Sequence, residues 1–257
     1  MRPRFTDRVV VVTGGGSGIG LAVARAFARE GARLVLAGRH LDRLQQIPDA
    51  LPVVCDVTQR DQVEALFAQT LAHFGRLDIL VNNAATGIVG PLEAVPFPAA
   101  QALFETNFFG TFHCCQAILP HFRRQGHGHI VNVASLAGLR GLPNAVYAAS
   151  KAAVIGMSES LRLEVAAQNI HVTLVCPGRV RATDTDFFNT AQRFGDAKLS
   201  DSPSELTADA VATALLDATA KRRRLVILPF HARLLYILNK FFPHLADRIL
   251  YKYVPQR

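Results

Sequence analysis

Short apolar runs rich in valine, isoleucine and leucine recur along the first 228 residues, and most alternate with segments of helical periodicity. Runs of this kind are typical of strands that are buried on both faces of a parallel sheet. The predicted strands span residues 8–13, 33–37, 51–56, 77–81, 129–134, 171–176 and 224–228. Strands that alternate with helices predict an α/β fold, a doubly wound parallel sheet of about seven strands with helices on both faces.

Two helical patterns are longer than the others, at residues 97–124 and 145–167. The first contains Asn107, close to Gly110, and both residue types are unfavourable inside a helix. Because local rules tend to be broken at functional sites, Asn107 is a candidate site residue.

Residues 179–201 have no clean periodicity and mix Phe187, Phe188 and Phe194 with polar residues. A long irregular segment in a compact domain is commonly a lid, here expected to cover the substrate. Its phenylalanines indicate either an apolar cleft or anchors in the core. The Ser-Pro-Ser-Glu run at residues 202–205 has the spacing of a helix start, so the next helix is predicted from there.

The chain of 257 residues is 50% hydrophobic and 19% charged, which is compatible with one domain and a large core. We expect residues 1–228 to form this domain and residues 229–257 to form an appended extension. The four cysteines lie in or beside apolar runs without metal or disulfide spacing, which predicts buried thiols, a reducing compartment and no metal site. The absence of a visible signal peptide favours a cytoplasmic location.

The formal net charge of +8 is confined to the C-terminal end of the chain. Residues 221–257 contain nine Lys or Arg and one acid, whereas residues 1–220 contain 19 basic and 19 acidic residues. Beyond residue 228, apolar residues fall at helical spacing with basic residues on other faces, and Pro243 divides the pattern into two helices.

This basic amphipathic extension has several possible uses. It can pack on its own domain, cover the mouth of the active site, form an oligomer interface, lie on an anionic membrane surface, or dock an acidic partner. Charges interrupt it too often for it to span a bilayer. Binding of nucleic acid is not expected, because basic and aromatic residues are not interleaved and no groove-reading motif is present.

A glycine-rich turn lies between the first predicted strand and the helix that follows it. Gly14, Ser17, Gly18, Ile19 and Gly20 belong to this turn. Glycines let the backbone approach a ligand closely, and the unpaired N–H groups at a helix N-terminus attract anions. This arrangement predicts a site for the pyrophosphate of a nucleotide.

The ends of the next two strands carry candidate nucleotide ligands. The second strand ends at Gly38 and Arg39, where a carboxylate would favour NAD(H). An arginine pairs with a 2′-phosphate instead, which favours NADP(H) over NAD(H), unless Arg39 only solvates the strand end. Asp56 ends the third strand and can accept a hydrogen bond from adenine or cap a turn.

Tyr147 and Lys151 are four residues apart in the predicted helix 145–167, so they project from the same face. An ammonium about 4 Å from a phenol could lower the phenol pKa by up to about three units. Such a phenol could serve as an acid or a base near neutral pH. The spacing also occurs in ordinary surface pairs, so the motifs around it decide the interpretation.

These motifs together resemble the short-chain dehydrogenase/reductase family over roughly residues 6–228. The resemblance rests on the strand and glycine turn at Thr13–Gly20, Asn82-Asn83-Ala84, Asn107, Ser135, Tyr147 with Lys151, and Pro177-Gly178, all in the family's order. It implies a Rossmann-type sheet and a single-domain oxidoreductase.

The resemblance implies roles for four catalytic residues. Tyr147 would be the general acid in carbonyl reduction and the base in alcohol oxidation. Lys151 would lower the phenol pKa and bind the nicotinamide ribose. Ser135 would donate a hydrogen bond to the substrate oxygen, and Asn107 would hold a water that connects Lys151 to solvent.

The resemblance also implies where a dinucleotide binds, with Asp56 at the adenine, Asn83 at the adenosine ribose and Pro177-Gly178 at the nicotinamide amide. The complete expected set is Gly14, Ser17, Gly18, Ile19, Gly20, Arg39, Asp56, Val57, Asn83, Ala84, Tyr147, Lys151, Pro177, Gly178 and Val180. Ser17 departs from the family, because NADP-dependent members often have a basic residue there.

The combined expectation is an NADP(H)-dependent oxidoreductase that acts on a carbonyl or secondary alcohol of an apolar substrate. The alternative is a non-catalytic nucleotide-binding sensor or scaffold, which would not need all four catalytic residues. The resemblance further implies a homodimer or homotetramer assembled through the two long helices, 97–124 and 145–167.

Overall fold

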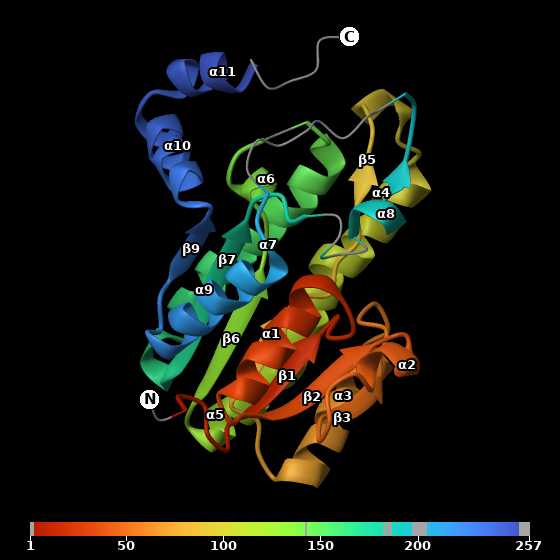
Figure 1. The fold of residues 1–257 in the computed structure, drawn as a ribbon, viewed down its shortest axis with the longest axis vertical. Coiled ribbons are helices and arrows are strands. Elements are labelled where there is room, and N and C mark those ends of the chain that lie inside the picture. Colours follow the sequence, from red (N-terminus) through yellow and green to blue (C-terminus); the bar gives the residue numbers. More distant parts are fainter. Residues whose placement is uncertain (1–2, 142, 182–183, 185–186, 197–204, 252–257) are drawn as a thin grey trace.

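The computed structural model describes residues 3–141, 143–181, 184, 187–196 and 205–251. Its centre is one parallel sheet with the strand order β3-β2-β1-β4-β6-β7-β9 (Figure 1). The strands are β1 (Val9–Thr13), β2 (Arg33–Gly38), β3 (Leu51–Val54), β4 (Ile79–Asn82), β6 (Gly128–Val133), β7 (Ile170–Pro177) and β9 (Leu225–Leu228). All pairings are parallel, and each strand overlaps a predicted one, so the predicted fold class is confirmed.

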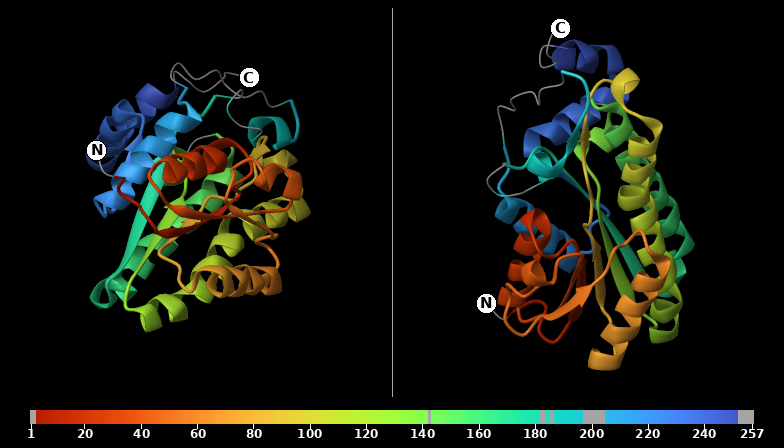
Figure 2. Two further views of the ribbon diagram at one scale, coloured as in Figure 1. Left: turned by 60° about the horizontal axis from the view of Figure 1, so that its bottom comes forward. Right: turned by 90° about the vertical axis from the view of Figure 1, so that its right-hand side faces the viewer.

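Helices cover both faces of the sheet (Figure 2). One layer contains α1 (Gly18–Arg29) and α9 (Ala208–Ala220), and the other contains α3 (Arg60–Phe74), α5 (Gly110–Gln125) and α7 (Ala145–Glu164). Side chains of a strand alternate between its two faces. In β1, Val10 and Val12 therefore pack with α1 and α9, while Val11 packs with α3 and α5. This double burial explains why the strands are nearly continuous apolar runs.

The predicted helix 97–124 is present, but its hydrogen-bond pattern changes in the middle. It consists of α4 (Phe97–Phe104), a π-helical turn η2 (Glu105–Phe109) and α5. Asn107 lies within the π turn and is buried. The locally unfavourable Asn107 of the sequence thus coincides with a π turn, a feature that is frequent at functional sites.

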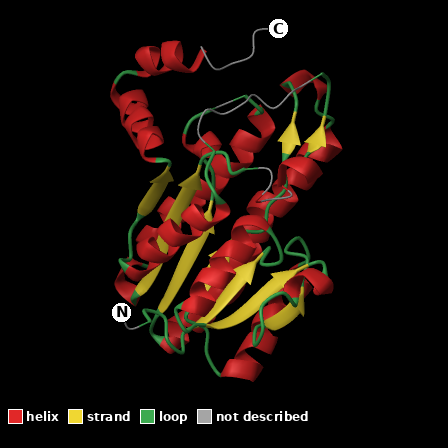
Figure 3. Cartoon of the chain, viewed as in Figure 1, coloured by secondary structure: helices red, strands yellow, loops and turns green. Residues whose placement is uncertain are grey.

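The shorter elements include a second, two-stranded parallel sheet that the sequence did not predict (Figure 3). Its strands, β5 (Ile88–Val89) and β8 (Gln192–Arg193), are two residues long and carry no periodic signal. The remaining short elements are α2 (Leu41–Leu44), η1 (Leu92–Ala94), α6 (Leu136–Leu139), η3 (Ala166–Gln168) and α8 (Phe187–Thr190).

The predicted helix start at residues 202–205 is wrong in its position. Residues 202–204 lie outside the described part of the chain, Glu205 is not helical, and α9 begins at Ala208. The hydroxyl of Thr207 accepts a hydrogen bond from the Ala210 N–H at 3.0 Å, so Thr207 is the N-cap.

Two C-terminal helices follow β9, namely α10 (Phe230–Phe241) and α11 (Pro243–Tyr251). Pro243 begins α11, as the predicted division into two helices requires. Both helices lie beyond the carboxyl ends of the strands, at one end of the molecule (Figure 1). Among the described residues, no helix is both long and apolar enough to cross a bilayer.

Candidate active site

A large cavity of about 2440 Å³ lies at the carboxyl ends of the strands. Its wall includes the glycine turn after β1, the end of β2, the start of α7 and residues of α10 and α11. Ligands of doubly wound sheets bind at this edge. Pockets for a single small molecule measure about 300–1000 Å³, so this cavity has room for a dinucleotide and a second ligand.

The glycine turn has the geometry of a phosphate cradle. Gly14 and Gly18 have φ angles of +64° and +52°, a region that glycine adopts without strain. A Cβ atom on Gly20 would lie 2.1 Å from the Gly14 carbonyl oxygen, so only glycine fits there. The side chain of Ser17, the N-cap of α1, makes no capping hydrogen bond. The N-terminus of α1 borders the cavity, so these residues fit the pyrophosphate of a dinucleotide.

Asn83 holds this turn in place. Its side-chain amide donates to the carbonyl oxygens of Thr13 at 3.0 Å and Gly14 at 3.3 Å. The hydroxyl of Thr13 in turn accepts from the backbone N–H groups of Asn83 and Ala84 at 3.0 and 3.2 Å. The structure thus gives Asn83 a positioning role, while its contact with an adenosine ribose stays a prediction.

Basic side chains border the cavity at the end of β2. Arg39 is exposed and lines the cavity, and it makes no ion pair with any described residue. Arg43, on α2, also lines the cavity, and its Cβ lies 2.9 Å from the position that a Cβ on Gly16 would take. Two arginines therefore line this part of the cavity, although the sequence had pointed to Arg39 alone.

Asp56 and Val57 lie on the cavity wall after β3. One carboxylate oxygen of Asp56 accepts from the backbone N–H and the hydroxyl of Thr58, at 3.0 and 2.9 Å. Asp56 therefore caps a turn, which was one of its two predicted uses. Val57 is buried and packs against Gly110 of α5, which ties this wall to the core.

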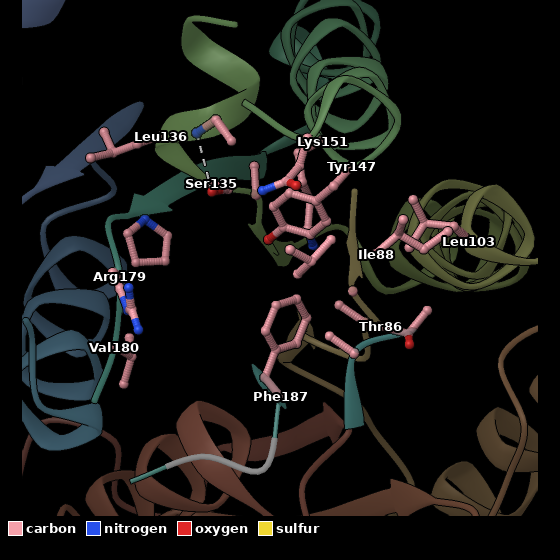
Figure 4. A pocket seen from close by; sticks show the side chains of 18 of the residues that line it. Thr86, Ile88, Leu103, Ser135, Leu136, Tyr147, Lys151, Arg179, Val180 and Phe187 are labelled. Atoms are coloured by element: carbon pink, nitrogen blue, oxygen red, sulfur yellow. Dashed lines mark hydrogen bonds between the residues drawn. The ribbon is translucent and has the colours of Figure 1, made fainter. Parts of the chain in front are cut away.

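Ser135, Tyr147 and Lys151 lie near one another on the wall of the cavity (Figure 4). Ser135 follows β6 and is the N-cap of α6, where its hydroxyl accepts from the Ala137 N–H at 3.2 Å. Tyr147 and Lys151 lie on α7, as predicted. The Lys151 ammonium is buried and donates to the Val133 carbonyl oxygen at 3.2 Å.

The prediction of a lowered phenol pKa is wrong for the protein alone. Burial raises the pKa of Tyr147 to about 12, although hydrogen bonding by Ser135 acts in the opposite direction. Burial also lowers the pKa of Lys151 to about 8. Desolvation disfavours the charged forms of both side chains, whereas the prediction considered only the attraction between ammonium and phenolate.

Because a buried ammonium is costly, Lys151→Met should stabilise the fold at neutral pH, by up to about 3 kcal/mol. Below pH 8 Lys151 is protonated in both the folded and the unfolded state, so the folded state carries the full free-energy cost of the buried charge. As the pH rises from about 8 towards 10.5, the unfolded state alone keeps the proton, so the wild type gains stability. The advantage of the variant should therefore shrink over this window.

Urea unfolding at pH 7 and pH 10 measures this difference. Lys221→Met is the matched control, because Lys221 is exposed and its replacement should change the stability little. Equal stability of Lys151→Met and wild type at both pH values would show that the ammonium is not destabilising.

Asn107 connects three parts of the site. Its side-chain oxygen accepts from the Thr86 N–H at 2.8 Å. Its amide donates to the Thr86 carbonyl oxygen and to the Ser150 hydroxyl, both at 3.1 Å. The π turn is thereby fixed to the segment after β4 and to α7. The expected role of Asn107, to hold a water that connects Lys151 to solvent, stays a prediction.

The remaining predicted cofactor residues lie after β7. Pro177 ends this strand, and the Gly178 N–H donates to the Leu228 carbonyl oxygen at 2.7 Å. Val180 is buried and forms an isolated bridge with Leu206. All three residues line the cavity, together with Ile19 of the glycine turn.

Two features of the site were not foreseen from the sequence. Phe187, one of the three lid phenylalanines, packs edge-to-face on Tyr147 with ring centroids 5.7 Å apart (Figure 4). Phe194 instead lies against Gly90, and the side chain of Phe188 is outside the described part of the structure. The second feature is an ion pair between Arg140, just after α6, and Asp247 of α11.

Comparison with known sequences agrees with this site. The family model described as short chain dehydrogenase matches residues 8–193. YxnA, an uncharacterized oxidoreductase of Bacillus subtilis, is 33% identical over 97% of this chain and 73% of its own length. An uncharacterized oxidoreductase of Staphylococcus epidermidis is 35% identical over 82% of this chain and 92% of its own length.

Two solved structures have the same fold. A short-chain dehydrogenase/reductase of Burkholderia phymatum in complex with NAD has a TM-score of 0.82 at 28% identity, covering 99% of this chain and 98% of its own. A short-chain dehydrogenase of Burkholderia cenocepacia in complex with NADP has a TM-score of 0.82 at 27% identity, covering 97% and 99%.

The fold and the site define an oxidoreductase with a Rossmann-type nucleotide-binding sheet. The chain belongs to the short-chain dehydrogenase family, whose model matches most of its length.

Proposed function

We propose that the protein is an NADP(H)-dependent oxidoreductase that interconverts a carbonyl group and a secondary alcohol of an apolar substrate. One observation carries this proposal: Ser135, Tyr147 and Lys151 lie on the wall of the same cavity as the phosphate cradle. A sensor or scaffold would need the cradle without these three side chains.

The proposed chemistry assigns each polar group one task. When bound, the nicotinamide cofactor donates or accepts the hydride. The Tyr147 phenol gives its proton to the carbonyl oxygen during reduction and removes the hydroxyl proton during oxidation. The Ser135 hydroxyl hydrogen-bonds the same oxygen as negative charge develops on it.

Lys151 and Asn107 would support the phenol. The Lys151 ammonium would bind the nicotinamide ribose and stabilise the Tyr147 phenolate by its charge. The pKa of Lys151, lowered to about 8, lets this group exchange a proton near neutral pH. Asn107, fixed in the π turn, would hold the water through which that proton reaches solvent.

The basic residues at the end of β2 support NADP(H) rather than NAD(H). Arg39 and Arg43 both border the cavity beside the glycine turn. A guanidinium binds a phosphate through two parallel hydrogen bonds. Arg43 can thus supply the positive charge near the 2′-phosphate that Ser17 does not supply. The two similar solved structures contain NAD in one case and NADP in the other.

Arg39→Ala should weaken NADPH binding by about 10- to 100-fold, the usual effect of losing a hydrogen bond between charged groups. NADH binding should not change, because NADH lacks the 2′-phosphate. Isothermal titration of both cofactors into wild type and variant measures this. Arg25→Ala, an exposed site on α1, is the control.

The outcomes of this titration test the cofactor preference and the oxidoreductase proposal separately. Tighter binding of NADH than NADPH by the wild type would overturn the cofactor preference and leave the oxidoreductase proposal standing. Failure of both cofactors to bind would overturn the oxidoreductase proposal itself.

Apolar side chains around Tyr147 support an apolar substrate. Ile88, Leu103, Leu136 and Phe187 line the cavity near the phenol (Figure 4). We propose that the predicted lid acts through its described residues 187–196, in which β8 pairs with β5. Phe187 would then close over the substrate.

We also propose a homodimer or homotetramer that assembles through the α4–η2–α5 helix and α7. Large apolar side chains are exposed on these elements, namely Phe97, Phe109, Phe112 and Leu163. In this assembly residues 1–228 would form the common domain, and the extension 229–257 would stay outside the interface.

A further inference from the structure

The outer face of α10 carries an apolar stripe. Phe230, Leu234, Ile237 and Phe241 recur at helical spacing, and their exposed fractions are 72%, 57%, 44% and 68%. We call these four residues the C-terminal stripe. Large apolar side chains in a contiguous exposed row mark a contact surface more often than isolated ones do.

The charges around the C-terminal stripe are of one sign. Arg233, Lys240 and Arg248 are exposed, and they form no ion pair with any described residue. Asp247 is the one acid among residues 221–257, and its carboxylate is paired with Arg140 of the main domain. The free charges on α10 and α11 are therefore cationic.

The stripe lies at the rim of the active-site cavity. Leu234 belongs to the stripe and also lines the cavity, as do Leu238 on α10 and Ile249 and Tyr251 on α11. Both helices lie at the end of the molecule where the strands end (Figure 1). A surface that covers the stripe would therefore lie next to the mouth of the cavity.

We infer that α10 and α11 seat the protein on an anionic membrane surface, and that the substrate is a lipid-soluble carbonyl or alcohol taken from that membrane. The C-terminal stripe would enter the boundary between headgroups and acyl chains, as amphipathic helices do. Arg233, Lys240 and Arg248 would pair with lipid phosphates. The inference about the substrate rests on the proposed oxidoreductase function, whereas the inference that α10 and α11 bind a membrane does not.

The charge distribution disfavours a second copy of the chain as the occupant. A twofold contact brings the same surface of both subunits together. The stripe of one copy would then face the stripe of the other, and the three unpaired cations of each would meet like charges. An anionic lipid surface has the opposite charge.

Co-sedimentation of the full chain with vesicles tests the seating. The wild type should bind vesicles that contain phosphatidylglycerol, should not bind vesicles of phosphatidylcholine alone, and should release at high salt. A cation near an anionic surface contributes about fivefold to binding. The triple variant R233E/K240E/R248E should therefore bind at least about 100-fold more weakly.

The matched control is R25E/R29E/R124E, which changes the net charge equally but at exposed sites on α1 and α5. It should bind nearly as well as the wild type. If both triple variants lose vesicle binding equally, net charge alone explains the binding, and the proposal that α10 and α11 bind the membrane is overturned.

Insertion can be followed by fluorescence, because the chain contains no tryptophan. In Phe241→Trp the single indole should shift its emission to shorter wavelength when anionic vesicles are added. Val54→Trp, at an exposed site on β3, should not respond. A shift in Phe241→Trp that depends on protein concentration without lipid would show a second copy on the stripe and overturn the proposal.

Turnover separates this inference from the proposed function. With a long-chain ketone dissolved in anionic vesicles, R233E/K240E/R248E should be slower than the wild type in proportion to its lost binding. With a short water-soluble ketone, the two should be equal. Equal rates with both ketones would overturn the membrane route, whereas turnover of neither ketone by the wild type would overturn the proposed function instead.

Discussion

Tyr147→Phe should lower the turnover number by about 10²- to 10⁴-fold, the usual contribution of a general acid or base. The variant loses one oxygen and keeps the ring that packs on Phe187. Cofactor affinity and thermal stability should therefore stay unchanged. The raised phenol pKa of about 12 keeps the proton on Tyr147 at neutral pH, which suits the donor role in carbonyl reduction.

The measurement is single-turnover oxidation of NADPH with an apolar ketone, followed by absorbance. Tyr236→Phe is the control, because it removes the same hydroxyl from a tyrosine on α10 that lines the same cavity. It should keep nearly full activity. Full activity of Tyr147→Phe would show that another group delivers the proton.

Gly20→Ala should abolish cofactor binding at practical concentrations, with an affinity loss on the order of 100-fold or more. The new Cβ would lie 2.1 Å from the Gly14 carbonyl oxygen and 2.5 Å from the amide nitrogen of Asn83. Real Cβ atoms do not approach other atoms so closely, so the cradle must open. The hydrogen bonds from Asn83 to Thr13 and Gly14 would be lost with it.

Gly156→Ala is the matched substitution. Gly156 is exposed on α7, and a Cβ there meets no atom within 4 Å. Alanine should stabilise this helix by up to about 1 kcal/mol and leave cofactor titration unchanged. Wild-type affinity of Gly20→Ala for NADPH would show that the phosphates bind elsewhere.

The sequence predicted the sheet well because burial on both faces leaves a strong signal. Most strands of the main sheet are rich in Val, Ile and Leu, and β1 is buried throughout. Strands β5 and β8 escaped prediction because each has two residues, and their pairing depends on contacts distant in sequence. The start of α9 was misplaced because two competing cap signals, Ser202 and Thr207, lie five residues apart.

The sequence predicted which residues line the site better than it predicted their pKa values. Spacing alone placed Tyr147 and Lys151 on one helix face, but it carried no information on burial. Burial decided both pKa values, and it reversed the expected direction for the phenol. That α10 and α11 form part of the cavity wall was one of several possibilities that the sequence left open, because the pairing of Arg140 with Asp247 spans 107 residues of sequence.

The π turn at Asn107 amounts to one extra residue in an otherwise regular helix. One residue corresponds to about 100° of rotation, so the faces of α4 and α5 are turned relative to each other. Leu103, before the turn, can line the cavity, while Cys114 and Ile118, after it, stay in the core. The two halves of the helix can therefore change sequence independently, and new substrate contacts can arise on α4 without repacking the interior.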